Sequence, residues 1–245
     1  MGRMAGGRRL LVRAGAVAAA LAVVVLLAAG QTGAQGQNRN SPGQFDFYVL
    51  SLSWSPSFCA EAARRHTGRS ASLQCGARPF SFVVHGLWPQ YDSGFPEYCQ
   101  MPAPRLDRRI VSVMLDLMPA PHLIFNEWDR HGTCSGLSPA AYFDTVRKAR
   151  AAVTIPPDYN DLKAPLTVAP AAVAGAFIAA NPGLTASAVA VTCNGGRLTE
   201  VRLCLAKDFA AAATPPARFH DCAAVVKRGC RRDRLVMPPL RGGDG

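Results

Sequence analysis

The residues best suited to chemistry lie together in the segment NEWDRHGTC, residues 126–134. If this segment is helical, side chains three or four residues apart share one face. Glu127 then lies one turn from His131, and Arg130 lies on nearly the same side. A carboxylate, a guanidinium and an imidazole at one helix end are the groups that acid–base catalysis on a charged substrate requires. A salt-bridged helix end with a capping histidine is the alternative interpretation.

A second histidine follows an apolar run. The segment FVVHGLWP, residues 82–89, predicts a strand over Phe80–Val84 that delivers His85 to its end, before a turn. A lone histidine at a strand end is more often structural than catalytic. Two histidines, however, serve as an acid–base pair near neutral pH, because the ordinary imidazole pKa is about 6.5.

Together the two segments carry a specific resemblance. His85-Gly-Leu-Trp-Pro and Glu127-Trp-Asp-Arg-His131-Gly-Thr-Cys resemble the two active-site segments of the ribonuclease T2 family, secreted acid endoribonucleases of the transferase type, in a bacterial-type member. The resemblance covers residues 45–237. It implies a metal-independent enzyme that cleaves single-stranded RNA with low base specificity, first to 2′,3′-cyclic phosphate and then to 3′-phosphate ends. The implied nucleophile is the ribose 2′-hydroxyl, so no cleavage of DNA is expected.

The resemblance also implies roles for single residues. His131 would be the base and His85 the acid, while Glu127 and Arg130 would hold and polarise the phosphate. Glu127 is also expected to stabilise a protonated His131 across the helix turn. Asn126 stands where many members have a third histidine that contacts phosphate, so an uncharged amide takes that place. Arg130 replaces a more frequent lysine and keeps the charge.

Base binding is expected beside the first motif, at Trp88, Gln90 and Tyr91. Gln90 stands where some family members have an aspartate that reads a base, so the base preference is open. The loop from Gln90 to Pro104 is rich in proline, glycine and aromatic residues, and such aromatic loops hold unstacked bases in other proteins. For Tyr91 and the other loop aromatics, ordinary packing is the alternative.

Residues 1–34 are predicted to be a secretory signal peptide. Arginines precede the apolar run Ala14–Ala29, and small residues follow it. The run is near the length that spans a bilayer, so an uncleaved anchor is the alternative. Residues 35–44 are expected to form a flexible arm, and 45–245 the ribonuclease catalytic domain. The expected product is secreted or periplasmic, with no stable membrane association once the signal is removed.

The chain is basic. Its formal net charge is +11, and the four arginines of residues 1–34 leave +7 for the remainder. A basic surface attracts polyanions such as nucleic acid, although exported proteins with no such partner are often basic as well. We expect an RNA substrate and a monomeric protein.

The chain has eight cysteines, all after the leader. An even count in an exported chain indicates disulfides, but eight cysteines allow about a hundred pairings. The family resemblance implies Cys59–Cys75, Cys99–Cys134, Cys193–Cys230 and Cys204–Cys222. The cysteine and histidine spacings match no zinc site, so neither a metal nor another cofactor is expected.

The remaining pattern predicts an α+β fold: one domain with a central antiparallel sheet, several packed helices and disulfide staples. Helices are expected at 106–118, 123–131, 138–150 and 168–180, and strands at 45–54, 80–84, 188–193, 198–205 and 234–237. His66, in the short basic segment that the first disulfide encloses, is expected to be a solvated loop residue. His122 and His220 match no catalytic pattern and are expected to be structural or on the surface.

Two other functions compete with this interpretation. Residues 132–136, GTCSG, have the form of a nucleophile elbow. A nucleophilic Cys134 would leave an odd number of cysteines, and an elbow follows a strand rather than a helix. The other alternative is a catalytically weak or inactive secreted protein that binds RNA or another partner. The presence of His85, Glu127 and His131 argues against this alternative.

Overall fold

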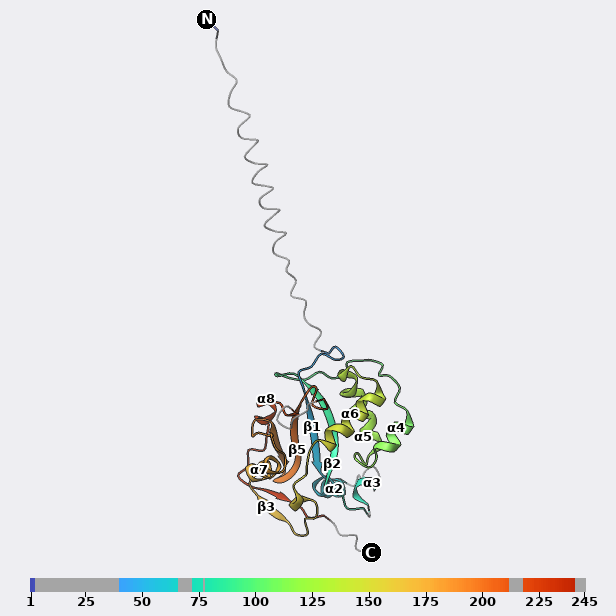
Figure 1. Ribbon diagram of the computed structural model, residues 1–245, viewed down its shortest axis with the longest axis vertical. Coiled ribbons are helices and arrows are strands. Elements are labelled where there is room, and N and C mark those ends of the chain that lie inside the picture. The colour runs from blue at the N-terminus through green and yellow to red at the C-terminus, as the bar shows by residue number, and fades with distance from the viewer. Residues whose placement is uncertain (3–39, 66–71, 77, 212–217, 241–245) are drawn as a thin grey trace. The chain divides into compact units, whose positions relative to one another are not determined.

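The computed structural model describes residues 1–2, 40–65, 72–76, 78–211 and 218–240. The chain divides into two units, 1–38 and 39–245, and every helix and strand below belongs to the second (Figure 1). The predicted signal peptide after Gly2, residues 35–39 of the predicted arm, and His66 lie outside the described residues. Within those that are described, no helix combines the length and apolarity needed to cross a membrane.

A sheet runs through this unit and has six strands in the described part of the chain. The strands are β1 (Phe47–Trp54), β2 (Phe82–Gln90), β3 (Leu166–Val168), β4 (Val189–Asn194), β5 (Arg197–Ala206) and β6 (Leu235–Met237). Their order is β2-β1-β5-β6-β3, and β4 also pairs with β5. All pairings are antiparallel except that of β5 with β6, which is parallel at a single register position. The predicted antiparallel sheet is therefore confirmed, apart from that one contact.

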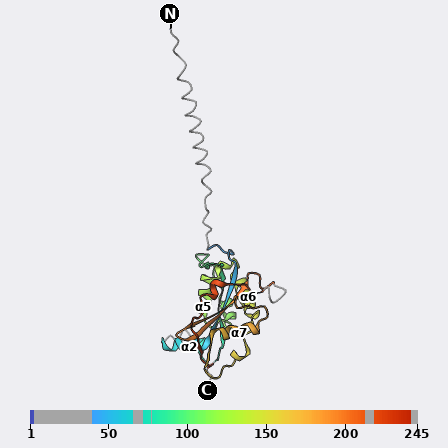
Figure 2. The same cartoon turned by 90° about the vertical axis from the view of Figure 1, so that its left-hand side faces the viewer.

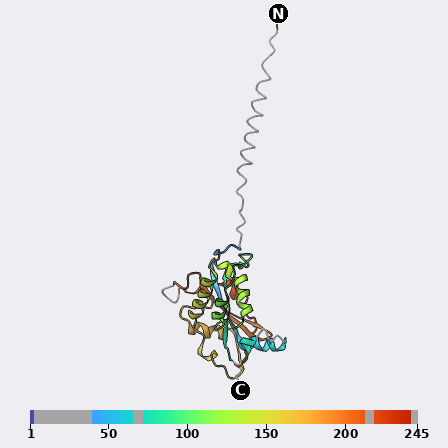
Figure 3. The same cartoon turned by 90° about the vertical axis from the view of Figure 1, so that its right-hand side faces the viewer.

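Helices pack against the sheet on the side of β2 and on the side of β4. They are α2 (Ser55–Arg64), α3 (Ser72–Cys75), α4 (Arg108–Met114), α5 (Pro121–Arg130), α6 (Pro139–Ala151), α7 (Pro170–Ala180) and α8 (Ala223–Val226), with short 3-10 turns η1 (Gly132–Ser135) and η2 (Pro157–Tyr159). Helices α4, α5 and α6 lie on the side of β2, the side from which Figure 3 views the molecule. Helices α7 and α8 pack against β4 on the other side, and α7 is labelled in Figure 2.

Strand β1 separates two apolar regions, because successive side chains of a strand point to opposite faces. Leu50 and Leu52 belong to the main core, together with Tyr142 of α6 and Phe177 of α7. The other face carries a smaller cluster, in which Val49 packs with residues of β5 and α8. The main core packs against one face of the sheet. The other face is partly open and can hold a site.

Strand β2 is longer than the sequence predicts. It does not stop at Val84 but continues to Gln90, paired with β1 along its whole length. Ser51 pairs with Gly86 and Leu52 pairs with Val84, so His85 is the additional residue of a β-bulge. A bulge bends a strand and re-aims a side chain. The prediction of a turn after His85 was wrong, and the bulge explains how His85 leaves the regular alternation of the strand.

The helix that carries the second motif begins two residues earlier than predicted and ends one residue earlier. Pro121 occupies its first turn, where a proline costs no hydrogen bond. The α-helix ends at Arg130, within one residue of the predicted end, and the 3-10 turn η1 follows from Gly132 to Ser135. The residue with the left-handed conformation that favours glycine is Gly136, at φ 76°.

All four disulfides join the cysteines that the family resemblance implies: Cys59–Cys75, Cys99–Cys134, Cys193–Cys230 and Cys204–Cys222. The first one closes the short basic segment that contains His66. It joins α2, which has Pro56 in its first turn, to α3. Two of the disulfides, Cys193–Cys230 and Cys204–Cys222, join loop segments to β4 and β5, and the other two join helices, turns and loops to one another. The predicted disulfide-stapled α+β fold is confirmed.

Candidate active site

His85 projects from the bulge of β2 between two carboxylates. Its Nδ1–H donates to Oε1 of Glu200 on β5, and its Nε2 lies 3.6 Å from Oε1 of Glu127 on α5. The His85 side chain is 33% exposed, so it can still meet a ligand. The bulge and the β1–β5 register bring a β2 histidine and a β5 acid together although they are far apart in sequence.

Glu127 is buried beside the first motif, with 2% of its surface exposed. Its Oε2 accepts a hydrogen bond of 2.7 Å from the indole Nε1–H of Trp88. A side chain at Gly86 would collide with this carboxylate, because a Cβ there would lie 2.9 Å from Cδ of Glu127 and nearer still to its Oε2 and to Nε1 of Trp88. The glycine of the His-Gly-Leu-Trp motif thus lets β2 approach α5 closely.

His131 lies at the end of α5, where it is 7% exposed. Its ring centroid is 5.4 Å from that of Trp88, and the His85 centroid is 5.3 Å from it, so the indole packs beside both histidines. Nδ1 of His131 has no hydrogen-bond partner among the described residues. The contacts of Glu127 are with His85 and Trp88, and its stabilisation of a protonated His131 stays a prediction.

Two residues of the site were missed from the sequence, Glu200 and Arg202 of β5. Oε2 of Glu200 accepts hydrogen bonds from Nε and Nη2 of Arg202, at 2.9 and 2.7 Å. The Arg202 guanidinium also lies 5.1 Å from the Trp88 ring centroid. A signal for them exists in the sequence: Glu200 and Arg202 lie two apart in a largely apolar strand and therefore share one face, and a buried face that carries charge is unusual.

Side chains of both motifs line one hollow of about 280 Å³. The residues that line it are Val49, His85, Trp88, Gln90, Phe95, Asn126, Glu127, Arg130, His131, Arg202, Val225 and Arg228. All three predicted catalytic residues and both predicted phosphate-binding residues are among them. The structure therefore brings together the two motifs that the sequence singled out.

The three predicted base-binding residues do not share one environment. Trp88 and Gln90 line the hollow, where the side-chain amide of Gln90 donates to the Pro89 carbonyl at 3.0 Å. Tyr91 is not among the lining residues; it packs against the main core. Phe95, which lies four residues further along the loop, lines the hollow instead.

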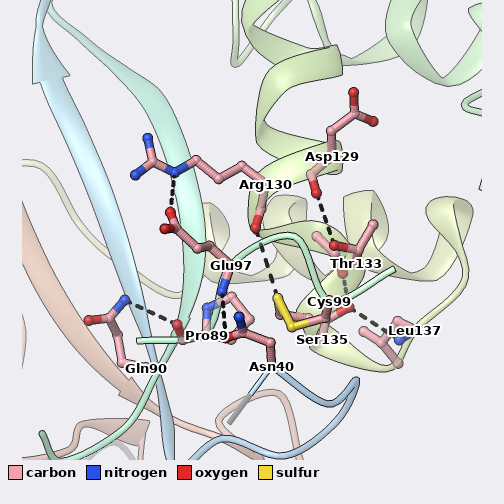
Figure 4. Close-up of a disulfide and its surroundings, with 12 residues drawn as sticks. Asn40, Pro89, Gln90, Glu97, Cys99, Asp129, Arg130, Thr133, Ser135 and Leu137 are labelled. Carbon is pink, nitrogen blue, oxygen red and sulfur yellow. Dashed lines mark hydrogen bonds and ion pairs between the residues drawn. A yellow bond between two sulfur atoms is a disulfide. The ribbon is translucent and has the colours of Figure 1, made fainter. Parts of the chain in front are cut away.

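Arg130 is the cation at the end of α5, and it forms an ion pair with Glu97. Its Nε donates to Oε2 of Glu97 at 2.8 Å, and both side chains are well exposed (Figure 4). An exposed pair of this kind contributes at most about 1 kcal/mol to stability. Arg130 can therefore turn toward an anion in the hollow at little cost.

The disulfide Cys99–Cys134 ties the loop after β2 to the end of α5 (Figure 4). Beside it, the Tyr98 N–H donates to the Arg130 carbonyl at 2.8 Å. The Gly43 N–H donates to the Cys134 carbonyl at 2.9 Å, so the described end of the predicted arm also contacts this segment. Cys134 is fully buried in this bond, which excludes it as the nucleophile of an elbow.

The two histidines have opposite electrostatic surroundings. Burial disfavours the charged form of His85, but the hydrogen bond and charge of Glu200, with the charge of Glu127, outweigh it and raise the pKa of His85. Burial lowers the pKa of His131 to about 3, and the positive charges of Arg130 and His85 add to this effect. Near neutral pH the surroundings thus favour a protonated His85 and a neutral His131.

The carboxylates beside His85 also differ from each other. Burial raises the pKa of Glu127 to about 6, although the charge of His85 and the Trp88 hydrogen bond oppose the change. Burial would raise the pKa of Glu200 too, but His85 and Arg202 together lower it to about 2. Glu200 is therefore a permanent anion of the site.

The remaining candidate groups lie elsewhere or are absent from the described chain. His122 lines a neighbouring hollow on the other side of His85, and His220 stacks on Phe47 with its Nε2 3.4 Å from Oδ1 of Asp92. Across residues 40–240, apart from the undescribed gaps, no cluster of three or more histidine, cysteine, aspartate or glutamate side chains is arranged to hold a metal ion.

Comparison with known proteins identifies the family. Residues 45–214 match the Ribonuclease T2 family, which is more than half of the chain, so the chain belongs to this family. It is 44% identical over 103 residues to a ribonuclease of Aeromonas hydrophila, covering 42% of this chain and 43% of that protein. It is 35% identical over 130 residues to a probable ribonuclease of Haemophilus influenzae, covering 49% and 47%. The chain spans about half the length of these curated relatives.

A solved structure supports the fold. The RNase-related protein from Calystegia sepium superposes with a TM-score of 0.61 and covers 80% of this chain and 98% of that one. At 18% sequence identity, this likeness establishes the fold alone.

Proposed function

We propose that this protein is a metal-independent endoribonuclease that cleaves single-stranded RNA by transesterification through the ribose 2′-hydroxyl. The observation that carries the proposal is the pair of imidazoles in one hollow with opposite pKa shifts. A transesterification needs one group that accepts a proton and one that donates a proton at the same pH. Residues whose surroundings push their pKa values apart are suited to these two roles.

In the first step, neutral His131 accepts the proton of the 2′-hydroxyl. The 2′-oxygen forms a bond to the adjacent phosphorus, and the bond from phosphorus to the 5′-oxygen breaks. Nε2–H of His85 gives its proton to the departing 5′-oxygen. In the slower second step the roles reverse: His85 takes a proton from water, which opens the 2′,3′-cyclic phosphate, and His131 returns its proton to the 2′-oxygen.

Negative charge builds on the phosphoryl oxygens during both steps. Arg130 supplies positive charge at the rim of the hollow, and Asn126 supplies an amide donor. Glu127 with its raised pKa would hold a proton in mildly acidic solution and then donate to a phosphoryl oxygen. This assignment suits an enzyme that works on the acid side of neutrality.

The hollow is suited to one unpaired nucleotide at a time. Its volume of about 280 Å³ is just below the range of small-ligand sites, roughly 300–1,000 Å³. Trp88 and Gln90 are the proposed base-binding residues; Tyr91, which packs against the core, would act only by supporting the loop. An indole face stacks on any base, so low base specificity is expected.

We also propose how the enzyme is exported and processed. Residues 1–34 would direct export and be removed, residues 35–44 would link them to the catalytic domain of 45–245, and the product would be a secreted or periplasmic monomer. Four disulfides among the described residues support an oxidising compartment.

Incubation of the purified protein with a single-stranded RNA tests the proposal. The expected products carry 2′,3′-cyclic phosphate and 5′-hydroxyl ends, and the rate is unchanged by EDTA. A substrate with 2′-deoxyribose at the scissile position should bind and resist cleavage. Binding of RNA without cleavage would instead identify a catalytically inactive RNA-binding protein, and metal-dependent cutting of DNA would contradict the mechanism.

A further inference from the structure

We propose that Glu200 is a positioning residue for the acid His85, and that Arg202 holds Glu200 in place for this task. The proposal deepens the proposed function, because it concerns how His85 keeps the proton that the reaction consumes. It rests on the geometry of β5, which neither of the two motifs includes.

The position of Glu200 follows from the sheet register. Glu200 pairs with Ser53 of β1, and Arg202 pairs with Ser51, which in turn pairs with Gly86 beside the bulge. The two serines are small, so the long side chains of β5 can reach across β1 to β2. The bulge at His85 turns the imidazole toward them, and the hydrogen bond from Nδ1–H to Glu200 results.

That hydrogen bond decides which nitrogen of His85 can do chemistry. A carboxylate only accepts hydrogen bonds, so it keeps a proton on Nδ1 in both charge states of the ring. The proton that His85 exchanges is therefore the one on Nε2, the nitrogen on the Glu127 side. After His85 has donated this proton, the neutral ring is left with a bare Nε2, which is the form needed to activate water.

Arg202 makes Glu200 a fixed anion. Two of its N–H groups occupy Oε2 of Glu200, which leaves Oε1 for His85. Glu200 is buried at 8% exposure, so it depends on these partners for its charge. The Arg202 guanidinium also lies over Trp88, and thereby connects the position of Glu200 to the indole that packs beside both histidines.

Several other charged or titratable groups line the two hollows that His85 borders. Glu127, Arg130 and His131 approach from the end of α5, and the neighbouring hollow adds Glu61, Arg64, His122 and Arg197. Among the carboxylates, only Glu200 and Glu127 are within 4 Å of the ring in the described structure. Of these two, Glu200 is hydrogen-bonded to the ring and Glu127 is not.

The test is the pH profile of kcat/KM for Glu200→Gln, which keeps the shape and an acceptor but removes the charge. Loss of a neighbouring opposite charge lowers a histidine pKa by about 1 unit or more. The alkaline limb of the profile should therefore move to lower pH by about 1 unit, with a loss of roughly tenfold on that limb that is regained as the pH falls. A merely structural ion pair would lower the whole profile without moving its limb.

Arg202→Gln provides a second variant, which tests whether Arg202 holds Glu200 in place. Release of Glu200 should weaken its hydrogen bond to His85 and move the alkaline limb downward, in the same direction as Glu200→Gln. The shift should be smaller, because the charge of Arg202, which itself lowers the pKa of His85, is removed as well. Asp116→Asn is the matched control, because it also breaks a carboxylate–arginine pair, with Arg147, outside the site. The control should keep the parent profile.

The result that would overturn the proposal is an alkaline limb shared by Glu200→Gln and the parent, or one that Arg202→Gln leaves in place or moves upward. An NMR titration of the His85 ring in the same folded variants gives the pKa without any substrate. If the parent protein does not cleave RNA, the proposed function fails, while the shift of the His85 titration still decides the role of Glu200.

Discussion

The site has a sheet half and a helix half, and each contributes one histidine. In the sheet half, His85 lies between Glu200 and Glu127, with 33% of its side chain exposed. In the helix half, His131 is buried beside the cation Arg130, and its Nδ1 has no partner in the described part of the chain. The surroundings raise the pKa of the first ring and lower that of the second.

The difference shows how one side-chain type can serve two roles. Imidazole has an ordinary pKa of about 6.5, so two equivalent histidines would be protonated together. Here carboxylates on β5 and α5 keep one ring charged, whereas burial keeps the other neutral. In the proposed mechanism, the shared hollow therefore holds both the proton donor and the proton acceptor.

The largest expected effect comes from removing either ring. His85→Ala and His131→Ala should each lower the rate by about 10²–10⁴ or more, because each removes one proton transfer. Single-turnover kinetics on RNA with a melting curve for each variant measure the effect. His220→Ala removes a histidine that lies outside the hollow and should retain the parent rate. Near-parent activity in a folded His85 or His131 variant would show that the ring has been given the wrong role.

Gly86→Ala should damage the contact between the two halves. The new methyl group would force the Glu127 carboxylate and the Trp88 indole away from β2. A displacement of about 1 Å in a catalytic group can cost on the order of 10²-fold in rate, and we expect a loss of that size at temperatures where the variant is folded. Kinetics on RNA below the melting temperature measure it.

Gly175→Ala is the matched control for that variant. Gly175 lies in α7, and a Cβ there meets nothing within 4 Å. This variant should keep full activity and gain about 0.5–1 kcal/mol of stability, because alanine is favoured over glycine inside a helix. Equal activities for the two variants would mean that the close approach at Gly86 has no role in catalysis.

A smaller effect is expected when the disulfide of the helix half is removed. Cys99→Ala/Cys134→Ala should lose activity by less than the glycine variant while still folded, since Cys134 follows His131 closely and Cys99 belongs to the loop after β2. Both this variant and Cys193→Ala/Cys230→Ala should lose about 2–5 kcal/mol of stability. Only the first should lower the rate of the folded enzyme, as measured by kinetics well below each melting temperature. Equal rates would contradict a role for Cys99–Cys134 in holding the site.

The helix half of the site was predicted from the sequence better than the sheet half. The helical spacing of Glu127, Arg130 and His131 placed the helix half correctly, because it depends on local geometry alone. The sheet half was missed in part, since Glu200 and Arg202 reach His85 only through the β1–β5 register and the bulge. Neither is a local property of the chain.

The extent of β2 was missed for a related reason. Gly86 and Pro89 are residues that favour turns, yet pairing with β1 carries the strand through both of them. A proline is tolerated there because β2 is an edge strand of the sheet. The disulfide pairing was predictable from family resemblance, although the cysteine count alone left it open.

An NMR titration of the two rings in the parent protein tests the central claim most directly. Resonances can be assigned with His85→Ala and His131→Ala. Because burial lowers the pKa of His131 to about 3, its ring should remain neutral at pH 5 and take up a proton only in stronger acid. The ring of His85, whose pKa is raised, should remain protonated at a pH near 6.5, where a free imidazole is half titrated. Midpoints that coincide near 6.5, or that occur in the reverse order, would contradict the assignment of His131 as base and His85 as acid.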